Sequence, residues 1–162
     1  MEILALAQKM ELEGKTYYEK LARETEVAQL KGVFTFLAEQ EQGHYDLFKE
    51  IEKGAAPASV GEDATLGKKV KELFGALSAS FSLPEVVYDY ETAYGNALEM
   101  EKESVKLYAD LAAGVDEAGK KTVEFIIAQE ESHVRLLESL IDFVSNTKSW
   151  LENAEWRHID AY

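Results

Sequence analysis

Residues 36–48, "FLAEQEQGHYDLF", return 89 residues later as "FIIAQEESHVRLL" at 125–137. An earlier segment, "MELEGKTYY" at 10–18, recurs as "MEKESVKLY" at 100–108. Both segments are rich in residues that favour a helix. The two segments also occur in the same order in each half of the chain. The sequence therefore predicts a helical hairpin that occurs twice, in a bundle with internal two-fold pseudosymmetry.

Helical periodicity extends well beyond these segments and predicts four long helices. They lie at about residues 2–25, 29–53, 85–113 and 118–146. The stretch 54–67 is rich in Gly, Ala, Pro and Ser and predicts a loop, whereas residues 68–81 predict a short helix. Pro84 suits the first turn of the third long helix. We expect an all-α four-helix bundle over 1–146 with a long crossover at about 54–84, followed by a short C-terminal helical tail at 147–162.

Each predicted helix has an apolar stripe that a glutamate interrupts near its middle. The four are Glu11, Glu41, Glu101 and Glu130, and His44 and His133 follow two of them one turn later. Burying an unpaired carboxylate costs several kcal/mol or more, so four in one core require a positive partner. Two divalent cations would balance them. Glu13 and Glu103 lie off the stripes and should face solvent.

The glutamates are also spaced so that they reach one level of the bundle. The midpoint between Glu11 and Glu41 falls within "ETEVAQ", and that between Glu101 and Glu130 falls within "GVDEAG". Both segments are expected turns, and residues equally far from a turn lie at the same height in an antiparallel hairpin. A long crossover would let the third helix run antiparallel to the first.

A Glu-x-x-His spacing by itself is weak evidence for a metal site in a chain this rich in glutamate. All three histidines have it, including His158 after Glu155. His44 and His133 are repeat partners of each other, whereas His158 has none. We therefore interpret Glu155 and His158 as a coincidence.

The combined pattern resembles the diiron-carboxylate proteins of the ferritin-like superfamily, in which two helices each supply a Glu and two others each supply Glu-x-x-His. The paired "MExExxxxY" segments look most like rubrerythrin-type members. The resemblance implies two iron ions, bridged by Glu41 and Glu130. Glu11 and Glu101 would be terminal ligands, and His44 and His133 would each complete one ion. The spacing E-x6-Y, in Glu11 to Tyr18 and in Glu101 to Tyr108, also implies that these two tyrosines lie near the site and hydrogen-bond ligands.

Two features of rubrerythrins proper are missing from the sequence. Those proteins end in a rubredoxin domain that binds iron through Cys pairs, and this chain has no Cys. They also carry an additional Glu ligand one turn from the third-helix Glu. Here the residues one turn from Glu101 are Ala97, Leu98, Ser104 and Val105. We therefore expect both metals to keep the same protein ligands in the reduced and oxidised states.

The resemblance implies a diiron oxidoreductase of peroxidase or oxidase type that protects against oxidative stress. It would react with hydrogen peroxide or dioxygen and take electrons from a separate donor, such as a rubredoxin-type protein. A ferroxidase or iron-handling protein is one alternative, and a non-catalytic metal-binding bundle is another. The ligand types suit Fe²⁺ or Mn²⁺, and Zn²⁺ would also bind.

Composition restricts the partners and the compartment. The net charge of −14 argues against nucleic acid and against an anionic membrane surface. The sequence contains neither an apolar run of membrane-spanning length nor a signal-peptide pattern, so we expect a cytoplasmic protein. The absence of Cys excludes disulfides and thiolate metal sites. Trp150 and Trp156 in the tail would either cap the bundle or pack against a second subunit, and of these two arrangements we favour a homodimer.

Overall fold

Four long helices make up most of the computed structural model, which describes residues 2–55, 72, 75 and 90–159, with side chains up to residue 146. They are α1 (Glu2–Glu24), α2 (Ala28–Glu52), α4 (Tyr90–Ala112) and α5 (Glu117–Ile159). No strand occurs among these residues, so the expected all-α fold is confirmed. Glu72 and Gly75 are helical. The rest of the predicted short helix at 68–81, and Pro84, lie outside the described residues.

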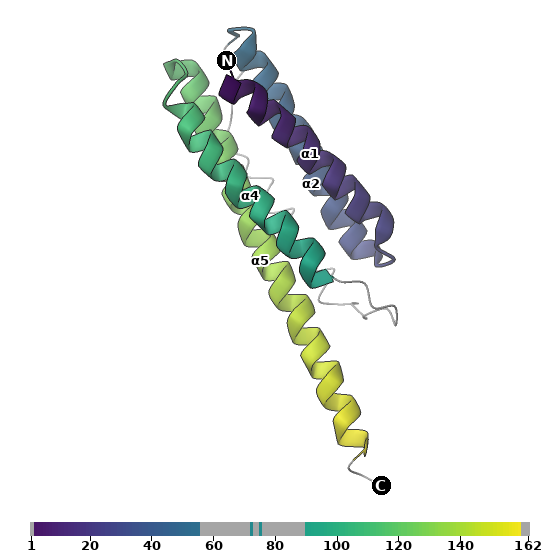
Figure 1. The fold of residues 1–162 in the computed structure, drawn as a ribbon. Helices are drawn as coiled ribbons and strands as arrows, with labels where there is room; N and C mark the ends of the chain where they lie inside the picture. The colour runs from purple at the N-terminus through teal and green to yellow at the C-terminus, as the bar shows by residue number, and fades with distance from the viewer. Residues whose placement is uncertain (1, 56–71, 73–74, 76–89, 160–162) are drawn as a thin grey trace.

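The helices form two hairpins that pack face to face. Helix α1 packs along α2 and α4 along α5, and the hairpins meet through α1 with α4 and α2 with α5. Figure 1 shows that the α1–α2 turn and the α4–α5 turn lie at opposite ends of the bundle. Helix α1 therefore runs antiparallel to α4, as the repeated hairpin requires, and the four-helix bundle is confirmed.

Local hydrogen bonds fix where the second hairpin turns. The backbone N–H of Gly114 donates to the carbonyl of Leu111 at 2.9 Å and closes the end of α4. The Asp116 carboxylate then accepts the N–H of Gly119 at 2.8 Å, which is the contact of a helix N-cap. Helix α5 consequently begins within the predicted turn "GVDEAG", which fixes the height of the residues that follow.

The apolar core is divided into two clusters. One lies toward the α1–α2 turn and includes Phe34, Tyr94 and Leu140. The other lies toward the α4–α5 turn and includes Phe48 and Ile126. The buried charged residues of all four helices lie in the level between the clusters. The fold thus encloses a layer of buried polar residues between two apolar clusters.

The C-terminal tail is helical to Ile159 and continues α5 without a break, rather than forming a helix of its own. Figure 1 shows α5 extending past the ends of the other helices. The side chains of Trp150, Glu155, Trp156 and His158 lie outside the described part of the chain. Among the described residues, no helix combines the length and the apolar character needed to cross a membrane.

Candidate metal centre

The six side chains singled out in the sequence meet in the polar layer. All of them are at most 4 % exposed: Glu11, Glu41, His44, Glu101, Glu130 and His133. They form two overlapping groups, and within each group one ligand atom per residue lies within 4.8 Å of the others. Glu11 and His44 belong to the first group, and Glu101 and His133 to the second. Glu41 and Glu130 belong to both, so each lies where it could bridge two ions.

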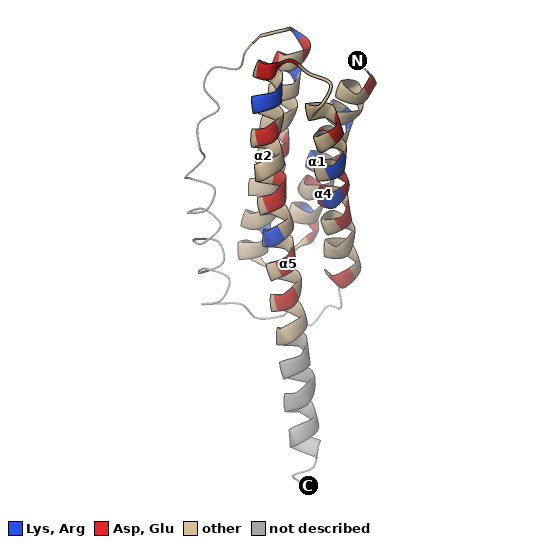
Figure 2. Cartoon of the chain, turned by 90° about the vertical axis from the view of Figure 1, so that its left-hand side faces the viewer, with Lys and Arg blue, Asp and Glu red and all other residues tan. Residues whose placement is uncertain are grey.

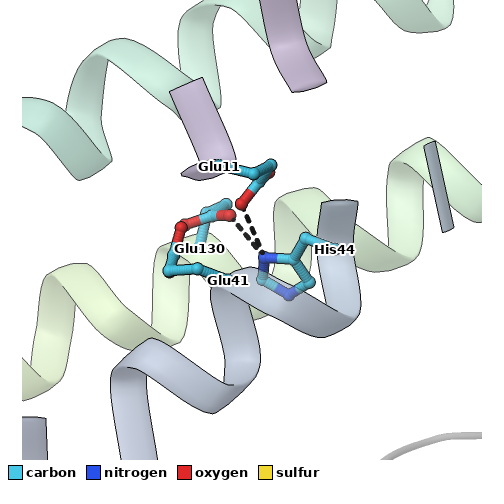
Figure 3. Close-up of side chains that lie close together, drawn as sticks. All are labelled: Glu11, Glu41, His44 and Glu130. Atoms are coloured by element: carbon cyan, nitrogen blue, oxygen red, sulfur yellow. Dashed lines mark ion pairs between the residues drawn. The ribbon is translucent and has the colours of Figure 1, made fainter. Parts of the chain in front are cut away.

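In the first group, two carboxylates converge on one imidazole nitrogen. Nδ1 of His44 lies 2.8 Å from Oε1 of Glu130 and 3.5 Å from Oε2 of Glu11. Figure 3 shows both carboxylates directed at the His44 ring, with Glu41 beside them. These side chains come from α1, α2 and α5, so packing of both hairpins is needed to assemble the group.

The second group repeats this arrangement around His133. Its Nδ1 lies 3.3 Å from Oε1 of Glu41, 3.3 Å from Oε2 of Glu130 and 3.5 Å from Oε2 of Glu101. The His44 and His133 rings stack with their centroids 5.6 Å apart. Equivalent atoms of the two groups therefore face a common centre.

The polar atoms that face this centre lie within ion-pair distance of one another, but hydrogen bonds do not satisfy them. Among the described residues, no hydrogen bond reaches Oε2 of Glu11, Oε1 of Glu41, either oxygen of Glu130, or Nδ1 of His44 and His133. Buried polar atoms are normally satisfied, and leaving several unsatisfied in one place is costly. Oxygen and imidazole donors in this proportion fit two divalent ions of the Fe²⁺ or Mn²⁺ type.

Without metal, protons take over part of the charge balance. Burial raises the pKa of Glu41 well above its ordinary value, and the negative charges of Glu130 and Glu101 raise it further. Burial and the charge of Glu130 raise the pKa of Glu101 to about 8. Burial, together with the repulsion between the carboxylates, thus leaves some of them protonated at neutral pH.

For the two histidines and Glu130, the charges of neighbouring groups outweigh the effect of burial on the pKa. Burial alone would lower the pKa of both histidines. The charge of Glu130 instead raises the pKa of His44 well above its ordinary value, and the charge of Glu101 does the same for His133. Burial alone would raise the pKa of Glu130, but the positive charge of His44 and the contacts with Glu101 and His133 hold it well below its usual range. Metal binding would have to displace the imidazole protons.

Glu11 and Glu101, the carboxylates that each belong to one ligand group, are the outer carboxylates of the centre. Each accepts a hydrogen bond from a tyrosine of the opposite hairpin. The Tyr18 hydroxyl donates to Oε1 of Glu101, and the Tyr108 hydroxyl donates to Oε1 of Glu11 at 2.6 Å. The sequence pattern pairs Glu11 with Tyr18 on one helix and Glu101 with Tyr108 on the other. In the structure each hydrogen bond crosses between α1 and α4.

Sequence reasoning missed one polar residue beside the centre, Gln129. Its Oε1 lies 2.7 Å from Nε2 of His44, and both side chains are buried. The available signal was the repeat itself, because a glutamine precedes each Glu-x-x-His, at Gln40 and at Gln129. Gln129 therefore fixes the face of the His44 ring that points away from the centre.

A cleft of about 320 Å³ leads from the surface between α1 and α4 to this centre. Glu41 and Glu101 line it together with the small residues Gly14 and Ser104. A Cβ atom on Gly14 would lie 2.9 Å from Oε2 of Glu41, so the glycine makes room for that carboxylate.

Two further acidic residues lie at the same cleft. Glu13 and Glu103 are exposed, as expected from the sequence, but they also line the cleft rather than lying apart from it. They belong to neither ligand group. No seventh carboxylate joins either group within the described ranges, which agrees with the residues that surround Glu101 in the sequence.

Comparisons with known proteins agree with this geometry. The sequence model of the rubrerythrin family matches residues 2–141, which include α1, α2 and α4 and the part of α5 that carries Glu130 and His133. An uncharacterised protein of Archaeoglobus fulgidus is 33% identical over 48 residues, which are 30% of this chain and 76% of that protein. No solved structure matches the chain. The chain belongs to the rubrerythrin family.

Proposed function

We propose that this protein is a non-haem diiron oxidoreductase that reduces hydrogen peroxide or dioxygen. The observation that carries the proposal is the pair of ligand groups that share Glu41 and Glu130. Family membership supports metal binding, and iron is the typical metal of rubrerythrins. Two ferrous ions held there would supply the two electrons that, with two protons, reduce one peroxide to two waters.

The position of each side chain in the two ligand groups indicates its role in holding the metals. Glu41 and Glu130 would bridge the two ions, since they alone belong to both groups. Glu11 with His44, and Glu101 with His133, would each complete one position. Tyr108 and Tyr18 orient the outer carboxylates through their hydrogen bonds.

The cleft between α1 and α4 is the proposed entry for the oxidant. Its volume of about 320 Å³ admits a molecule the size of peroxide. Gly14 and Ser104 line this cleft, and their small size leaves space in it for the oxidant. The two apolar clusters close the centre along the bundle axis, which limits the approach of water from either end.

Electrons would come from a separate donor, such as a rubredoxin-type protein. A thiolate-bound iron cannot be built from these 162 residues because they include no Cys. Since no seventh carboxylate joins either ligand group among the described residues, His44 and His133 would remain ligands in both redox states.

Metal analysis followed by rapid mixing tests the proposal. Protein from iron-replete cells should contain two irons per chain. When the reduced form is mixed anaerobically with peroxide, one equivalent of peroxide per chain should oxidise both ferrous ions. Glu130→Gln is the matched variant, because it keeps the side-chain volume but removes a bridging charge. A wild-type protein that binds iron but is inert to both oxidants would exclude the redox function and leave a metal-binding bundle.

A ferroxidase or iron-handling role is the second candidate, and the acidic surface favours it. Acidic residues recur along all four helices (Figure 2), and Glu13 and Glu103 line the cleft. A negative surface attracts cations toward a cleft. The two functions separate in the fate of the metal: a ferroxidase releases Fe³⁺ and accepts further Fe²⁺, whereas the oxidoreductase retains its two irons over repeated turnovers.

A further inference from the structure

The two histidines of the centre differ in what contacts their outer nitrogen. Nε2 of His44 lies 2.7 Å from the amide oxygen of Gln129. When Nδ1 binds a metal, the ring proton resides on Nε2 and can be donated to that oxygen. Such an outer hydrogen bond fixes the tautomer and the orientation of a metal-binding imidazole. His44 is therefore already held with Nδ1 toward Glu130.

The repeat-related contact is missing on the other side. Nε2 of His133 is buried and has no hydrogen-bond partner among the described residues. Gln40 occupies the position that corresponds to Gln129, but it is half-buried, and none of the described hydrogen bonds joins it to His133. The sequence is symmetric at these two positions, whereas the contacts are not.

We propose that Gln129 makes the two metal positions inequivalent, so that the position of Glu11 and His44 fills before that of Glu101 and His133. This inference rests on the proposed metal binding. Losing an outer-shell partner of a ligating histidine typically lowers metal affinity by about 10–100-fold. The first ion should accordingly bind more tightly than the second by a factor in that range. Gln129 acts as a positioning residue, since its contact is with His44 and not with the metal.

Titration of the metal-free full chain with Co²⁺ tests the order of filling. Bound Co²⁺ absorbs in the visible range, and the spectrum reports nitrogen and oxygen ligation independently of turnover. The wild type should show two steps separated by at least about tenfold in affinity. Gln129→Leu, of similar volume, should weaken the first step by about 10–100-fold and merge it with the second. Gln40→Leu is the matched control and should leave both steps unchanged.

A rescue variant separates positioning from packing. Gln129→Glu supplies an oxygen acceptor at the same place and should restore the two steps that Gln129→Leu loses. Circular dichroism of each metal-free variant checks that the bundle is intact.

A measurement on the wild type alone keeps the test independent of any substitution. Crystals grown with one equivalent of Mn²⁺ should show anomalous density mainly beside Glu11 and His44. Equal occupancy, or preferential filling beside Glu101 and His133, would overturn the inference. So would equal effects of Gln129→Leu and Gln40→Leu. A wild type that binds no Co²⁺ at all would overturn the metal centre itself, and this inference with it.

Discussion

The hydroxyl of Tyr108 on α4 donates a 2.6 Å hydrogen bond to Oε1 of Glu11 on α1. Both groups are buried, and the bond ties the two hairpins together beside the centre. Glu11 is 1 % exposed, so the loss of this donor would leave its carboxylate oxygen buried. The bond therefore serves both the stability of the fold and the orientation of an outer ligand.

Tyr108→Phe should lower the free energy of unfolding of the metal-free protein by about 1–3 kcal/mol, because it leaves a buried carboxylate oxygen without its donor. Urea denaturation followed by circular dichroism measures the change. Tyr45→Phe is the control, since Tyr45 is half-buried on α2 and lies outside the ligand groups. Equal losses in the two variants would show that the hydrogen bond to Glu11 is not the source.

Gly14→Ala should weaken metal binding by about 10–100-fold, the loss that is typical when the surroundings that orient a metal ligand are changed. The added Cβ would lie 2.9 Å from Oε2 of Glu41 and would push that carboxylate out of place. Gly43→Ala makes the same chemical change in α2, where nothing lies within 4 Å of the new atom. It should leave metal affinity unchanged and stabilise the helix by about 0.5–1 kcal/mol. Calorimetric titration of both variants compares them directly.

Removing a bridging carboxylate should affect both metal positions at once. Glu130→Ala should reduce binding from two metals to less than one tight metal per chain, since Glu130 belongs to both groups. The tail substitutions Glu155→Ala and His158→Ala should leave two. Elemental analysis after gel filtration gives the stoichiometry. Loss of metal in the tail variants with retention in Glu130→Ala would reverse the assignment.

Stability of the metal-free protein should fall as pH rises from about 4.5 to 8. Glu41 and Glu101 keep protons in the folded state at pH values where unfolded glutamate, with a pKa near 4.5, has lost them. The folded state then binds more protons than the unfolded state, so raising the pH toward about 8 removes stability. His44 and His133, whose pKa values are also raised, act in the same direction above pH 6.5.

Glu130 opposes this trend only at low pH, because its pKa is lowered and its contribution is lost below about 4.5. The melting temperature of the metal-free protein should drop by on the order of 10 °C between pH 5 and 8. Bound metal should remove the drop, because it replaces the protons and binds only the folded centre. A flat profile without metal would contradict a buried set of four carboxylates.

Periodicity and the internal repeat were sufficient to predict the bundle and to bring the six buried residues to one level. Both depend on distances along a helix axis, which sequence spacing determines directly. The contacts around that level depend on the rotation and crossing of neighbouring helices, which spacing does not determine. Gln40 and Gln129 show the difference: the repeat makes them equivalent, yet among the described hydrogen bonds Gln129 reaches a histidine and Gln40 does not. The crossed hydrogen bonds of Tyr18 and Tyr108 escaped prediction for the same reason.

The division into two hairpins also determines the order in which the chain can fold. Contacts within each hairpin are close in sequence and form quickly, whereas the contacts between hairpins close a much longer loop. The carboxylates of α1 and α2 meet those of α4 and α5 only at this late step, so electrostatic repulsion should slow docking rather than helix formation. Refolding followed by stopped-flow circular dichroism should show a fast helical phase with little pH dependence and a slower docking phase that accelerates at lower pH. A single phase with one pH dependence would show that the hairpins do not form separately.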